Sequence, residues 1–151
     1  MHFVKTMAPG WFASVMGTSV ASLAAWLMFA GTSFEWLADF LHVIAAALML
    51  ILGIAAVLRI LLYPKLVFET ISHPVEGSFY ATFPIALLVM AGQWSMRGID
   101  PMWVGLLWWV GAAGTFAASY LILFRLFTLD KLKLNMVTPA HFIPAVGLVV
   151  I

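Results

Sequence analysis

Five long segments without a charged residue determine what this chain can fold into. They cover residues 6–34, 40–58, 78–96, 102–124 and 135–151. A helix needs about 20 apolar residues to cross the hydrocarbon core of a bilayer. The first four segments reach roughly that length or exceed it, and the fifth has 17 residues. The pattern predicts an all-α integral membrane protein.

Composition supports this fold class and excludes others. Hydrophobic residues make up 65% of the chain and charged residues 9%, against roughly 45–50% and 25% in soluble domains. The segments do not alternate or break every 9–11 residues, as membrane strands do. Cysteine is absent, which excludes disulfides and thiolate metal sites. With no catalytic motif and a net charge of +1, we expect no catalytic residue, metal, cofactor or nucleic-acid partner.

Basic residues lie almost entirely on one side of the predicted membrane. Six of the seven precede the first segment or flank the second and fourth loops: Lys5, Arg59, Lys65, Arg125, Lys131 and Lys133. Only Arg97 lies on the opposite side, beside three acidic residues. Because cytoplasmic loops are rich in Lys and Arg, we expect a multi-pass protein of the cell membrane, surrounded by lipid, with a cytoplasmic N-terminus.

Prolines mark a repeat of 65 residues. Pro9, Pro74 and Pro139 open the first, third and fifth segments. Two membrane helices and two loops fit this period, as in parallel repeats of transporters. Within one membrane domain (1–151), we predict a first hairpin, a second hairpin and the start of a third over 7–67, 72–132 and 136–151. Chance spacing is the alternative, because proline is favoured at helix starts.

The fifth segment ends at Ile151 without a basic or aromatic anchor. Membrane helices rarely stop in mid-bilayer, because their last carbonyls would lack partners. We therefore expect a fragment of a longer protein.

Two further prolines distinguish the odd segments from the even ones. Pro84 and Pro144 lie inside the third and fifth segments, where a proline removes a backbone hydrogen bond and costs about 3 kcal/mol. The even segments contain no internal proline. We interpret the odd helices as kinked and lining a conduit that the even helices support. Ordinary packing kinks are the alternative.

Aromatic, small and hydroxyl residues complete the predicted lining. The repeat places Gly17, Thr82 and Gly147 at corresponding depths in the odd helices. With the two prolines, the candidates are Phe12, Gly17, Thr18, Thr82, Phe83, Phe142 and Gly147. Stripes of small residues at four-residue spacing let helices approach closely. We interpret two of them as packing surfaces: Ala13–Gly17–Ala21–Ala25 and Gly111–Thr115–Ser119.

Ionisable residues near the helix starts offer a second kind of chemistry. His73, Glu76 and His141 could handle protons, with an interfacial cap as the alternative role. His42 lies near the opposite interface, where we expect a wet or hydrogen-bonded neutral side chain.

Three strings resemble one family of membrane proteins. They are PGWFASVMGT (9–18), HPVEGSFYATFP (73–84) and TPAHFIPAVG (138–147). In this order, they resemble the tellurite-resistance/dicarboxylate transporter family, which includes plant slow anion channels and yeast malate and sulfite transporters. The resemblance spans essentially the whole chain.

The resemblance implies ten helices in five hairpins around a pseudo-fivefold axis, assembled as a homotrimer. The chain would supply about the first half, helices 1–5. Proline-kinked odd helices would form the inner ring, although the first odd segment has no proline between residues 14 and 20. The phenylalanine that plugs the pore in channel members belongs to the ninth helix, beyond this chain.

These patterns predict transport of small anions by passive, channel-like permeation. The partly positive starts of the odd helices would converge near Lys5, Lys65, Lys131 and Lys133 and attract anions without a buried fixed charge. One alternative is a proton-coupled carrier of C4-dicarboxylates or oxyanions such as tellurite or sulfite. Another is a non-transporting subunit or scaffold. An enzyme is disfavoured, because no paired buried carboxylates or metal cluster occur.

Overall fold

The computed structural model describes residues 2–72, 74–128, 142–143 and 147, and these residues contain no strand. Long helices dominate: α2 (Phe12–Phe29), α3 (Glu35–Leu62), α6 (Thr82–Met96) and α7 (Pro101–Thr128). Short elements surround them: α1 (His2–Thr6), α4 (Pro64–Ser72), α5 (Pro74–Ser78) and the 3-10 turns η1 (Pro9–Trp11) and η2 (Phe79–Ala81). Four helical stretches are long and apolar enough to cross a membrane. The predicted all-α membrane fold is confirmed.

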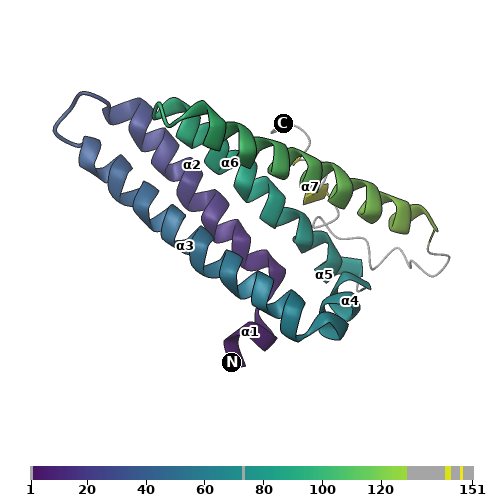
Figure 1. Cartoon of the computed structure of the whole chain (residues 1–151). Coiled ribbons are helices and arrows are strands. Elements are labelled where there is room, and N and C mark those ends of the chain that lie inside the picture. The colour runs from purple at the N-terminus through teal and green to yellow at the C-terminus, as the bar shows by residue number, and fades with distance from the viewer. Residues whose placement is uncertain (1, 73, 129–141, 144–146, 148–151) are drawn as a thin grey trace.

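The long helices lie side by side in the order α3, α2, α6, α7 (Figure 1). Ser22 Oγ donates to Ala38 O at 2.7 Å and joins the end of α2 to the start of α3, so these helices are antiparallel. Thr82 Oγ1 donates to Pro9 O at 3.0 Å, so α2 and α6 begin at the same end of the bundle. Two helix pairs, α2–α3 and α6–α7, therefore meet through their first helices.

Each helix pair turns on a glycine in the left-handed region. Gly31 has φ +76° after α2, and Gly98 has φ +70° after α6. Glycine adopts this conformation without strain and commonly ends helices in this way. After α6, Gly98 N donates to Ser95 O at 3.1 Å and Ile99 N to Trp94 O at 3.1 Å, which satisfies these two carbonyls of the last turn.

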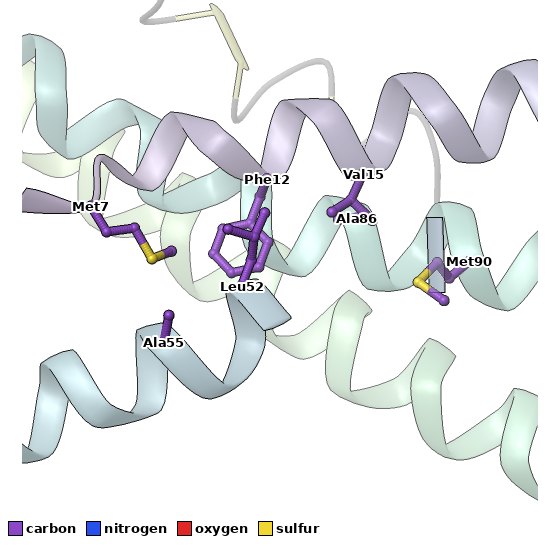
Figure 2. Packing of buried hydrophobic residues seen from close by; sticks show 7 residues of the cluster. All are labelled: Met7, Phe12, Val15, Leu52, Ala55, Ala86 and Met90. Carbon is purple, nitrogen blue, oxygen red and sulfur yellow. The ribbon is translucent and has the colours of Figure 1, made fainter. Parts of the chain in front are cut away.

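The core lies between α2, α3 and α6, with α6 most enclosed. Figure 2 shows its buried members: Met7, Phe12, Val15, Leu52, Ala55, Ala86 and Met90. In an apolar 18-residue stretch of the span that contains α6, 56% of the residues are buried, against 28%, 17% and 22% in the corresponding stretches of the α2, α3 and α7 spans. The odd helices are thus more enclosed than the even helices.

The outward surfaces of α3 and α7 are strongly apolar. Large exposed side chains include Leu50, Ile54 and Leu61 on α3 and Trp109, Phe116 and Tyr120 on α7. Water would disfavour apolar surface of this extent, whereas lipid tails accommodate it. These surfaces are suited to contact with a bilayer.

The junction of α4 and α5 allows a first test, because Gly77 has no room for a side chain. An added Cβ would lie 2.6 Å from the backbone oxygen of Ile71. Gly77→Ala should lower the free energy of unfolding by about 1–2 kcal/mol, measured by denaturant titration in detergent micelles. Gly53→Ala is the matched control, since its Cβ would meet nothing within 4 Å. Equal stability of the two variants would contradict the described junction.

Candidate functional site

The starts of the two odd helices are held together at one end of the bundle. This proline end contains η1 and η2, which contact each other. The Thr82 hydroxyl lies 3.0 Å from Pro9 O and 2.6 Å from Phe79 O. The rings of Phe12 and Phe83 meet edge to face with centroids 4.9 Å apart. The candidate residues Phe12, Thr82 and Phe83 are therefore brought together, and they fix α2 against α6.

Pro84 lies inside the third helical span, Glu76–Met96. It is the third residue of α6 and follows the 3-10 turn η2. Helical residues precede it without a break, so the missing N–H of this proline falls within the span and coincides with the change from 3-10 to α geometry. Pro84 is buried, and a Cβ added to Gly114 of α7 would lie 2.8 Å from its ring. This proline packs α6 against α7, and the kink expected at Pro84 stays a prediction.

The predicted equal depth of Gly17 and Thr82 is wrong. Thr82 lies beside Pro9, about two turns before Gly17 along α2. The reason is that α5 and η2 intervene between Pro74 and the start of α6, so a fixed spacing of prolines does not give a fixed spacing in depth. Gly147 is buried, and a Cβ added there would lie 2.5 Å from Ile85 Cδ1.

The candidate hydroxyl groups already donate to backbone carbonyls. Thr18 Oγ1 donates to Ser14 O, and Ser14 Oγ donates to Trp11 O at 2.6 Å. Thr82 Oγ1 has the two carbonyl partners given above. A hydroxyl carries a single proton, so these groups have no free donor to offer an anion.

One side of α2 is open and lined by small residues. A Cβ added to Gly17 would meet nothing within 4 Å. Its neighbours on this open face of α2 are also exposed: Ala13, Val20, Ala21 and Ala24. In the predicted packing stripe Ala13–Gly17–Ala21–Ala25, the first three residues are therefore exposed, and only Ala25 is buried as predicted. The second stripe does pack, because Gly111, Thr115 and Ser119 are buried.

Two arginines tie the ends of the bundle together. At the Arg97 end, opposite the proline end, Arg97 pairs with Asp39 and donates from Nη2 to Ala38 O at 3.0 Å. Its guanidinium also lies 4.9 Å from the centre of the Trp26 ring. At the proline end, Arg59 donates to Met7 O and, at 3.1 Å, to Thr70 Oγ1. In the sequence, the placement of the charges indicated only on which side of the membrane each of these arginines lies.

The remaining candidates are not assembled into one site. His73, His141 and Pro144 lie outside the described residues. Glu76 is exposed on α5, and Phe142 is 66% exposed. His42 Nδ1 is buried without a hydrogen-bond partner in the described part of the chain, whereas the residue as a whole is only half-buried, so its expected wet or hydrogen-bonded state stays a prediction. Within that part, no cluster of His, Cys, Asp or Glu could hold a metal.

Comparison with known proteins agrees with this architecture. Residues 6–151 match the family model described as voltage-dependent anion channel. Two uncharacterized transporters of Methanocaldococcus jannaschii, MJ0576 and MJ0762, are 31% and 34% identical over 100% and 99% of the chain. The chain spans 44% of the length of each relative. Both names describe transporters, in agreement with the prediction that the protein is not an enzyme.

Proposed function

The chain belongs to the voltage-dependent anion channel family, and from this premise we propose that it forms part of a pathway for small anions across a membrane. The family membership confirms the resemblance found in the three proline-containing strings. The protein is a multi-pass membrane protein with four described spans.

The observation that carries the proposal is the open face of α2. α2 and α6 run in the same direction with their starts in contact, while α3 and α7 occupy the outer positions (Figure 1). The side of α2 around Gly17 is left uncovered and uncharged. A wall of small side chains leaves room beside the helix for a hydrated ion.

The chemistry of this wall favours weak binding. Helix starts carry partial positive charge, and both odd helices present their starts at the proline end. No charged residue lies between Thr6 and Phe34 to hold an anion, and the hydroxyls of Thr18 and Thr82 donate elsewhere. Conduction requires entry that is favourable and binding loose enough to permit departure. These features support passive, channel-like permeation.

For the wider assembly we propose the arrangement expected from the sequence. We propose hairpins at 7–67 and 72–132 and the start of a third at 136–151, within a homotrimer of the full-length protein. The excess of Lys and Arg at one side supports a cytoplasmic proline end in the cell membrane.

Gly17→Phe tests the pathway. The new ring would enter the open side of α2 without meeting neighbouring atoms at Cβ. Chloride and malate efflux from proteoliposomes that contain the full-length protein should fall at least about tenfold, equivalent to about 1.4 kcal/mol of added barrier. Gly105→Phe on α7 is the control, because its Cβ also meets nothing within 4 Å. Similar flux through both variants would contradict a pathway along α2.

The driving force of the flux separates the alternatives. Efflux that follows membrane voltage supports a channel. Uptake that collapses with the proton gradient and ignores voltage would identify a coupled carrier, for which Glu76 is the described candidate. If the wild-type protein passes neither anion under any gradient, a scaffold becomes the better description.

A further inference from the structure

Buried polar side chains lie between the apolar core and the Arg97 end of the bundle. Gln93 of α6 is 1% exposed, and Ser19 of α2 is fully buried. In the described part of the chain, neither amide atom of the Gln93 side chain has a hydrogen-bond partner, and neither has Ser19 Oγ. Buried polar atoms are normally paired, and an unpaired one costs free energy. These atoms therefore disfavour the arrangement in which they are enclosed.

Gln93 faces the seam between the two helix pairs, α2–α3 and α6–α7. It follows Met90 by three residues and precedes Arg97 by four. Met90 belongs to the core between α2, α3 and α6, and Arg97 donates to Ala38 O of α3. Residues three or four apart share one face of a helix. The contacts on both sides of Gln93 thus direct this face of α6 toward α2 and α3.

Ser19 faces the same seam from α2. It lies between Val15, another core residue, and Ser22, whose hydroxyl is 3.5 Å from Arg97 Nη2. The open face around Gly17 points nearly the opposite way, because two residues along a helix rotate by about 200°. The seam is therefore separate from the open face of α2.

His42 brings another unpaired group from α3. It follows Ala38 by four residues and precedes Ala45 by three, and both alanines are fully buried. Ala38 O accepts the bonds from Ser22 and Arg97 that close this end of the seam. His42 Nδ1 is buried without a partner among the described residues. Ser19, His42 and Gln93 form what we call the polar layer, about one turn from Arg97.

The two ends of the seam are held differently. At the proline end, Thr82 bonds to Pro9 O, and the rings of Phe12 and Phe83 pack edge to face. At the Arg97 end, the guanidinium crosses the seam to a carboxylate that is 57% exposed. Ion pairs with an exposed partner stabilise weakly. The proline end is therefore the firmer of the two.

Water does not reach the unpaired atoms of the polar layer in the described conformation. Hydration would give them partners and remove the cost of their burial. We propose that the two helix pairs pivot at the proline end and part at the Arg97 end, so that water enters the seam and hydrates the polar layer. This opening does not depend on the proposed anion pathway, because it concerns the other side of α2.

Thiol labelling tests the opening, and the described sequence contains no cysteine of its own. Full-length Ser19→Cys and Val15→Cys proteins in nanodiscs are treated with a charged methanethiosulfonate reagent, and mass spectrometry counts modification of the peptide that contains each position. A thiol enclosed in apolar surroundings is inert, whereas a hydrated thiolate reacts. We expect Ser19→Cys to react at least about tenfold faster than Val15→Cys, which lies one turn deeper in the core. Equal rates in the two variants overturn the proposal.

Gln93→Met tests whether the unpaired atoms favour the opening. Methionine keeps the length of the side chain and removes both amide atoms. In the Ser19→Cys background, it should slow labelling by about tenfold and raise the Tm by a few degrees. Met90→Leu is the control, because it exchanges apolar side chains of similar volume on the same face and should leave the rate unchanged. A lower Tm in Gln93→Met would show that the amide is paired in the closed seam, and an unchanged rate would show that the polar layer does not favour opening. Either result overturns the proposal.

Discussion

Replacing Gly111 with leucine should lower the free energy of unfolding by about 3 kcal/mol. A Cβ at Gly111 would lie 3.0 Å from both Pro84 O and Leu88 Cγ. The backbone oxygen cannot move without displacing the start of α6, so α6 and α7 must separate. Denaturant titration of the purified protein in mixed micelles measures the loss.

Gly105→Leu on the same helix is the control, because it replaces a glycine with leucine without a steric clash. Its Cβ meets nothing within 4 Å, and leucine is a better helix former than glycine. We expect its stability to equal or slightly exceed that of the wild type. A cost below about 1 kcal/mol for Gly111→Leu would mean that the two helices do not approach as closely as described.

Replacing Arg97 with methionine should cost about 2–3 kcal/mol of stability. The side chain is only 13% exposed, and methionine keeps much of its volume while removing the bonds to Asp39 and Ala38 O and the contact with Trp26. The estimate is smaller than the sum of these interactions, because Arg97 Nε is buried without a partner among the described residues. The unfolding free energy in micelles again gives the readout.

Asp39→Asn provides the comparison for this end of the bundle. The Asp39 side chain is 57% exposed, and exposed ion pairs contribute at most about 1 kcal/mol. The asparagine variant should therefore lose clearly less stability than Arg97→Met. If Asp39→Asn is the more damaging change, the ion pair and not the buried contacts of Arg97 holds α6 to α2 and α3.

The membrane fold could be predicted from the sequence, because the length of each segment without charged residues can be counted directly along the chain. The order of the helices could also be predicted, since prolines distinguished odd segments from even ones. The depth of individual residues in the bundle could not be predicted, because α5 and η2 add helical residues after Pro74. Pro84 was correctly placed inside a helical span, but the 3-10 turn η2 that precedes α6 was not predicted.

The contacts of individual side chains could not be predicted from the sequence either. The stripes at Gly17 and at Gly111 look alike in sequence, yet the second is buried along its length and the first is buried only at Ala25. Which stripe packs depends on the three-dimensional order of helices. The bonds of Arg97 to α2 and α3 span 58 residues or more along the chain. In the sequence, the one indication that Arg97 has a special role was its position apart from the other basic residues.

The uncovered side of α2 also bears on biosynthesis. The first helix pair leaves the ribosome before any later segment exists to cover that side. Because its side chains are small and uncharged, acyl chains can solvate it at little cost while translation proceeds. A charged lining would have obliged the nascent chain to shelter that surface from lipid until the remaining helices were inserted.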